Sequence, residues 1–161
     1  MRRCLAGLLC GLSLVPFNAS LATQHDDVWD GLYRLEWVGG QERQGADMRI
    51  EQAPNADPTE LVEKYRSDLT RWTMLQVDAP RESTTLRRFL PAEYEGWGWD
   101  DLPKDVRIEC LDASRMFVCK TAPGTTISFG PDRPNRETLV AKTGIFGVVL
   151  HAGAFELKKL D

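Results

Sequence analysis

Polar and apolar side chains alternate in short stretches along much of this chain, and this period of two predicts half-buried β-strands. The clearest case is segment 31–38, where one face carries Tyr33, Leu35 and Trp37 and the other carries Arg34 and Glu36. Alternation resumes at 48–51, so 31–52 is predicted to form a hairpin with a long loop. Further strands are expected at 84–90, 106–111, 116–120, 125–129, 138–142, 147–151 and 154–160. Segment 145–150 also suits a short helical turn.

Helical spacing predicts one main helix, over residues 58–74. Asp57 suits the N-cap, Pro58 the first helical position, and Glu60 completes a capping-box pattern. Apolar side chains then recur every three or four positions, at Leu61, Tyr65, Leu69 and Trp72, and Val62 widens the apolar stripe. The predicted fold class is therefore α+β: a single domain in which an antiparallel, meander-like sheet of about six to eight strands packs against this helix.

The first 22 residues have the pattern of an export signal. Two arginines at the start precede an apolar run over 4–17, and Ser20-Leu21-Ala22 supplies the small residues that a signal peptidase needs. The run is too short and too interrupted to be a membrane-spanning helix. We expect cleavage after Ala22 and a single exported domain over 23–161, periplasmic or secreted, with no membrane insertion. The alternative is a buried N-terminal core helix.

The charge balance excludes one class of partner. The whole chain carries 20 basic and 24 acidic residues. The predicted leader holds two of the arginines and no acid, which leaves 18 basic against 24 acidic residues after cleavage. A nucleic-acid-binding protein needs a basic surface that displaces counterions from phosphates, so we expect no nucleic-acid partner.

Cys110 and Cys119 are the two cysteines that remain after the predicted cleavage. In an oxidising compartment such a pair normally closes a disulfide. Placing them opposite each other in a hairpin also pairs Glu109 with Lys120 and Leu111 with Val118. A redox-active pair would have the shorter Cys-x-x-Cys spacing, and further metal ligands are missing from the neighbourhood. The sequence predicts a structural disulfide, with no metal and no cofactor.

Candidate catalytic residues are scarce. His25 lies in a polar lead-in and His151 ends an apolar run, and neither has the spacing of a catalytic triad. The chain has no Gly-x-Ser-x-Gly elbow and no phosphate-binding glycine loop. We therefore expect a protein that is not an enzyme. The alternative is an envelope hydrolase with a carboxylate-centred or His151-centred site.

Segment 91–103 combines aromatic and acidic residues between two prolines, and it is the candidate working surface. Tryptophan and tyrosine are typical of binding hot spots, and acids around them attract a basic partner. The predicted partner-binding residues are Glu93, Tyr94, Glu95, Trp97, Trp99, Asp100 and Asp101. Two alternatives stay open: the tryptophans fold back against the sheet, or their ring faces stack on carbohydrate.

Export, a single disulfide, acidic charge and no catalytic motif together give a profile similar to that of small periplasmic inhibitor and immunity proteins of bacteria. The leading hypothesis is a non-enzymatic binding module that holds another protein, a toxin or a hydrolase, with a basic binding site. A structural accessory of an envelope or secretion machine is a further alternative.

Overall fold

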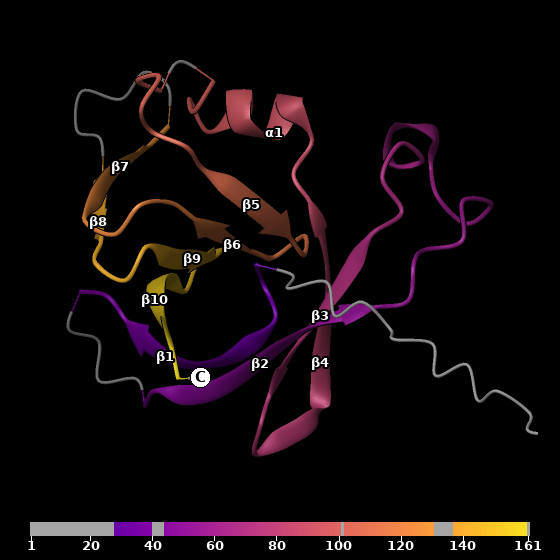
Figure 1. Ribbon diagram of the computed structural model, residues 1–161, viewed down its shortest axis with the longest axis horizontal. Helices are drawn as coiled ribbons and strands as arrows, with labels where there is room; N and C mark the ends of the chain where they lie inside the picture. The colour runs from indigo at the N-terminus through magenta and orange to yellow at the C-terminus, as the bar shows by residue number, and fades with distance from the viewer. Residues whose placement is uncertain (1–27, 40–43, 101, 131–136, 161) are drawn as a thin grey trace, which may run out of the picture.

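Short antiparallel strands dominate the computed structural model, which describes residues 28–39, 44–100, 102–130 and 137–160 (Figure 1). Within these residues the helical elements are a 3₁₀ turn, η1 (Glu63–Tyr65), and one helix of less than two turns, α1 (Pro91–Gly96). The strands are β1 (Gly31–Trp37), β2 (Ala46–Ala53), β3 (Arg71–Gln76), β4 (Ala79–Arg88), β5 (Glu109–Asp112), β6 (Met116–Lys120), β7 (Thr125–Phe129), β8 (Glu137–Ala141), β9 (Ile145–Val149) and β10 (Gly153–Lys159).

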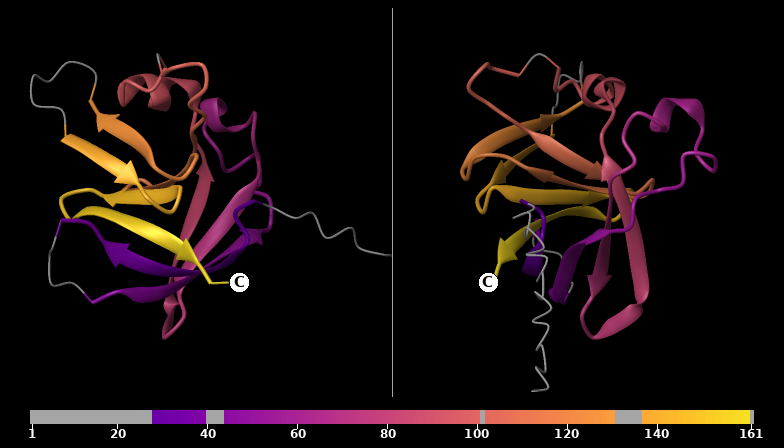
Figure 2. Two further views of the ribbon diagram at one scale, coloured as in Figure 1. Left: turned by 60° about the vertical axis from the view of Figure 1, so that its left-hand side comes forward. Right: turned by 45° about the vertical axis from the view of Figure 1, so that its right-hand side comes forward.

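Eight of these strands close into a barrel in which every neighbouring pair is antiparallel. Going round the barrel, the order is β1, β2, β3, β4, β5, β6, β9 and β10, and β10 pairs with β1 from Tyr33↔Lys159 to Trp37↔Phe155. The strands therefore follow chain order except where β7 and β8 leave the wall as a separate two-stranded sheet (Figure 2). The predicted α+β sheet packed on a helix is wrong: the sheet closes on itself instead.

Apolar side chains fill the inside of the barrel. Alternate residues of the strands point inward, so the barrel has a packed core. Close packing in the core requires glycine at position 147. A Cβ on Gly147 would overlap the ring of Phe155 and come within 2.6 Å of the Phe117 carbonyl oxygen. The buried members of this inner core are Trp29, Tyr33, Leu35, Ile50, Trp72, Met74, Leu86, Leu111, Val118, Ile145, Phe155 and Leu157.

The helix predicted over 58–74 does not form. Residues 71–74 of that segment belong to strand β3, which pairs with β2 over six residues and buries Trp72 and Met74 in the barrel. Trp72 and Met74 also have strand spacing, and long-range pairing on both sides of β3 outweighs the local helical pattern.

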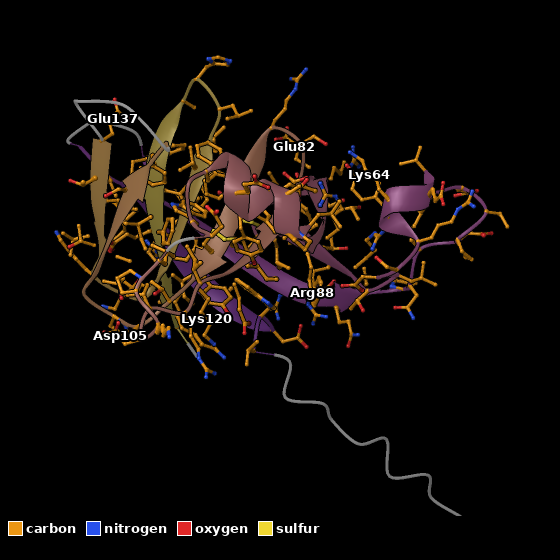
Figure 3. All side chains as sticks on the ribbon, turned by 90° about the horizontal axis from the view of Figure 1, so that it is seen from above. Lys64, Glu82, Arg88, Asp105, Lys120 and Glu137 are labelled. Atoms are coloured by element: carbon orange, nitrogen blue, oxygen red, sulfur yellow. A yellow bond between two sulfur atoms is a disulfide. The ribbon has the colours of Figure 1, made fainter. Side chains whose placement is uncertain are left out.

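The rest of that segment forms a loop that projects from the barrel (Figures 1 and 3). The Ala56 amide donates to the Leu69 carbonyl at 2.9 Å, which closes the base of the loop. Asp57, the predicted N-cap, accepts a 2.8 Å hydrogen bond from the Thr59 amide and so makes a local turn. Helical hydrogen bonding is limited to the single turn η1.

A second, outer core lies between the barrel wall and the β7–β8 pair. Its buried members include the rings of Phe89, Trp99, Phe117 and Phe146 and both cysteines of the disulfide. Cys110 and Cys119 are opposite each other in the β5–β6 pair and are bonded, with Glu109 opposite Lys120 as the sequence predicts. The predicted disulfide and its hairpin register are confirmed.

Other local predictions have mixed outcomes. The hairpin predicted over 31–52 is confirmed by the β1–β2 pairing, and 145–150 contains strand β9 rather than a helical turn. The predicted leader and His25 lie outside the described residues. No helix in the described ranges is long and apolar enough to cross a membrane.

Candidate functional site

Helix α1 begins where β4 leaves the barrel wall. Pro91 occupies the first turn, where its missing amide hydrogen has no cost. The Glu93 carboxylate accepts a 2.7 Å hydrogen bond from the Leu90 amide at the N-cap. The helix stops at Gly96, and Gly98 has a φ of 72°, a backbone conformation that glycine adopts without strain. The chain therefore turns sharply and returns Trp99 to the barrel.

Arg87 fastens α1 to the barrel. Its guanidinium lies 2.6 Å from one oxygen of Glu93 and 2.7 Å from an oxygen of Asp112 in β5. A second hydrogen bond, from Nη1 to Glu93 at 2.8 Å, makes the contact with Glu93 bidentate. The same guanidinium packs over the ring of Tyr65, 4.3 Å from its centroid, so the projecting loop joins the cluster. One cation therefore connects β4, β5, α1 and η1.

The environment shifts the pKa values of three groups here. Burial alone would raise the pKa of Glu93, but hydrogen bonds from Arg87 and the Leu90 amide outweigh it and hold the pKa below its ordinary 4.5. The hydrogen bond to Glu93 raises the pKa of Arg87. Burial raises the pKa of Tyr94. Arg87 and Glu93 are therefore both charged at neutral pH.

The two tryptophans of the predicted recognition segment pack inward. Trp99 is 4% exposed, and its indole N–H donates to the Ser128 carbonyl of β7 at 2.8 Å. Trp97 is half-buried, with its ring 5.0 Å from that of Phe117, and its carbonyl accepts a hydrogen bond from the Gly130 amide. This placement matches the alternative in which the tryptophans fold back against the sheet.

The remaining predicted residues are divided between structure and surface. The hydroxyl oxygen of Tyr94 accepts a 2.9 Å hydrogen bond from the Cys110 amide. Glu93 is engaged by Arg87. Glu95 and Asp100 are exposed, and Asp101 lies outside the described residues.

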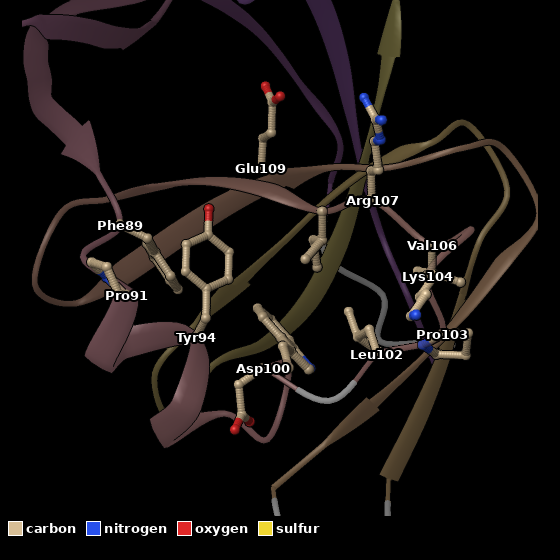
Figure 4. Close-up of a pocket in the computed structure, with 12 residues that line it drawn as sticks. Phe89, Pro91, Tyr94, Asp100, Leu102, Pro103, Lys104, Val106, Arg107 and Glu109 are labelled. Carbon is tan, nitrogen blue, oxygen red and sulfur yellow. The ribbon is translucent and has the colours of Figure 1, made fainter.

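A hollow of about 590 Å³ opens beside these residues, and we call it the α1 groove (Figure 4). We call the three aromatic rings of its lining, those of Phe89, Tyr94 and Trp99, the aromatic wall, and the three aliphatic side chains, those of Leu102, Val106 and Ile108, the aliphatic wall. Pro91, Pro103, Asp100, Lys104, Arg107 and Glu109 complete the lining. The volume is within the range of about 300–1,000 Å³ that is typical of small-ligand pockets.

Sequence reasoning missed the aliphatic half of this groove. It assigned Val106 and Ile108 to a strand, whereas β5 begins only at Glu109. It also predicted no helix at the start of 91–103, although Pro91 followed by Glu93 is a recognisable helix start. That signal would have been enough to predict α1. It would not have predicted the groove, because the two walls of the groove come from separate segments.

Two further hollows are present among the described residues. One of about 310 Å³ shares Phe89, Tyr94 and Glu109 with the α1 groove and reaches Trp29 of the inner core. Another, of about 390 Å³, lies between β1 and β8 and includes Glu156. The Glu156 carboxylate is buried there and accepts a 2.8 Å hydrogen bond from the Lys142 amide, so it supports the end of β8.

His151, the candidate of the hydrolase alternative, is exposed in the turn between β9 and β10, with a φ of 64°. Among the described residues, no side chain forms a hydrogen bond or ion pair with it. Within the same ranges, no group of three or more His, Cys, Asp or Glu side chains is placed to hold a metal ion.

Comparison with known proteins produced no match, whether to a family model, to a curated protein or to a solved structure.

Proposed function

We propose that the protein is a non-enzymatic binding module of the cell envelope or exterior that holds a segment of another protein in the α1 groove, as an inhibitor or immunity-type protein does. The observation that carries this proposal is the groove itself, an open apolar hollow between an aromatic and an aliphatic wall. The buried disulfide is compatible with an oxidising compartment and so with export.

The sequence predicted that the tryptophans of this protein insert into the partner, and the geometry favours the reverse. Trp99 is buried and its indole N–H already has an acceptor, so its ring serves as a wall and the partner supplies the inserted side chain. A wall held by packing and hydrogen bonds loses little entropy on binding, which favours affinity.

Charge favours a basic partner. Segment 91–109 holds six acidic and two basic residues. The groove lining carries two acids, Asp100 and Glu109, and two bases, Lys104 and Arg107, and the exposed Glu95 of α1 adds a further acid. Acids at the rim of a binding site raise the association rate of a basic partner more than they lower its dissociation rate.

The test places a photo-crosslinking amino acid at position 106, in the groove, and in parallel at position 62, which is 60% exposed on the projecting loop. The crosslinked partner is identified by mass spectrometry, purified, and its affinity measured. Val106→Trp, which fills the groove, should weaken binding at least thirtyfold, about 2 kcal/mol. Val62→Trp should leave the affinity unchanged.

A partner that crosslinks equally from both positions, or whose affinity survives Val106→Trp with the melting temperature unchanged, would overturn the proposal. The hydrolase alternative makes a different prediction. It requires hydrolytic turnover that is lost in His151→Ala or Glu156→Gln and retained in Val106→Trp.

A further inference from the structure

We propose that the segment held in the α1 groove is proline-rich and flanked by Lys or Arg. This inference rests on the proposed function and specifies the partner segment. Proline-rich segments adopt the extended polyproline II helix, which enters aromatic-lined grooves at low entropic cost.

The aromatic wall is rigid, because the rings of Phe89 and Trp99 are buried and held by the packing behind them. The rings of Phe89 and Trp99 are nearly parallel, at 12°, with their centroids 6.5 Å apart. The ring of Tyr94 crosses Phe89 at 62°, 5.2 Å away. Pro91 and Pro103 add rigid rings at the margins. Such a surface suits proline rings, which pack flat and have few rotamers to lose on binding.

The Tyr94 hydroxyl is a hydrogen-bond donor that a ligand carbonyl can use. The Tyr94 hydroxyl accepts from Cys110 and, among the described residues, donates to no acceptor, so its hydrogen is available to a ligand carbonyl. Proline has no amide hydrogen, and a polyproline II segment leaves its carbonyls free.

The two other common peptide-binding modes fit less well. Of the lining residues, Glu109 alone lies in a strand, so the groove presents no continuous edge to which a strand could add. A helix is about 10–12 Å across with its side chains, which is wide for a hollow of about 590 Å³.

The charges lie asymmetrically and give the ligand a direction. Asp100 lies on the α1 side of the groove, whereas both basic lining residues, Lys104 and Arg107, lie away from it, together with the second acid, Glu109 (Figure 4). A basic flank therefore belongs beside Asp100. At an exposed site its contribution is mainly to association rate and is weakened by salt.

The test uses the full exported chain and a synthetic peptide in which two arginines precede a run of prolines. Calorimetry measures affinity, and the Trp99 indole N–H resonance reports contact. We expect saturable binding that Tyr94→Phe weakens by up to about tenfold, since it keeps the ring and removes only the hydroxyl. Asp100→Lys should also weaken binding, whereas Glu82→Lys, the same charge change at an exposed site in β4, should not.

Two outcomes overturn the inference. Equal affinity for a peptide in which Gly and Ser replace the prolines would show attraction by charge alone. A proline peptide that fails to bind, while Val106→Trp still abolishes binding of the crosslinked partner, would overturn this inference and leave the proposed function standing. If Val106→Trp also leaves the crosslinked partner bound, the proposed function fails as well.

Discussion

At the scale of single residues, Trp99 is at once a core residue and a wall of the groove. The centroid of its ring lies 5.8 Å from that of Phe117 and 5.9 Å from that of Phe129. The same ring also lines the α1 groove. An exposed tryptophan would bind by inserting into a partner. A tryptophan fixed on its inner side acts instead as a surface of defined shape, so the groove depends on the packing behind it.

Trp99→Ala should therefore destabilise the fold. The ring is almost fully buried, so its removal leaves a cavity and should lower the free energy of unfolding by about 3–5 kcal/mol. Urea denaturation measures this. Glu95→Ala, at an exposed position on α1, should change the same quantity by less than about 0.5 kcal/mol. Similar small effects at both positions would show that Trp99 does not support the outer core.

At the scale of elements, α1 is too short to be stable alone and is held by its contacts. Isolated helices shorter than about 12–15 residues are marginal in water. The bidentate pair between Arg87 and Glu93, the hydrogen bond from the Cys110 amide to Tyr94, and the Trp99 ring attach both ends of the segment to the barrel. The α1 groove should thus lose its aromatic wall when these contacts weaken.

Acid should loosen α1 through Glu93. The pKa of Glu93 is lower in the folded protein than its ordinary 4.5, so the stabilisation from its charge is fully present above that pH. It is lost as the pH falls through the folded-state pKa. The difference in unfolding free energy between the wild type and Glu93→Gln should therefore shrink between about pH 7 and about pH 3, as chemical denaturation would show.

Glu95→Gln is the matched control, because Glu95 lies on the same helix, is exposed and forms no ion pair among the described residues. At neutral pH it should change the free energy of unfolding by less than Glu93→Gln does. A Glu93→Gln difference that is constant or grows on acidification would contradict the role assigned to the pair with Arg87.

The sequence predicted the elements whose conformation depends on residues close in the chain. It did not predict the elements whose conformation depends on pairing with distant segments. The 109–120 hairpin followed from its own pairs, since Cys110 opposite Cys119 fixes the register. The spacing of apolar residues in segment 71–76 is compatible with both a helix and a strand. The segment forms a strand because it pairs with β2 and β4, and the sequence alone did not reveal this pairing. The candidate site was half predicted: the aromatic segment was found and the burial of its tryptophans was one of the alternatives, but the aliphatic wall was not found.

At the scale of the whole molecule, the extent of strand pairing differs around the barrel wall. Strands β2 and β3 pair over six residues, whereas β4 and β5 pair over two, Arg87↔Asp112 and Arg88↔Leu111. The segment that forms α1 and the groove leaves the wall at this narrow seam. Any opening of the barrel should begin there, next to the binding surface.

Hydrogen exchange in the native state should show this gradient. Amides in the β2–β3 ladder should exchange only through global unfolding, because many neighbouring bonds must break together. Amides of β5 that face β4 should exchange through a smaller opening. Equal protection in the two ladders would mean that the seam is as firmly held as the rest of the wall.

The pairing of β1 with β10 has a kinetic consequence. It joins the first and last strands of the described chain, so the ring of strands cannot close until the final strand has been synthesised. Folds dominated by such distant pairings form slowly, in milliseconds to seconds. Until then β1 and β9 each keep one open edge, which in an incomplete chain is a site for aggregation. The barrel therefore reaches its native state only after β10 is available to pair with both β1 and β9.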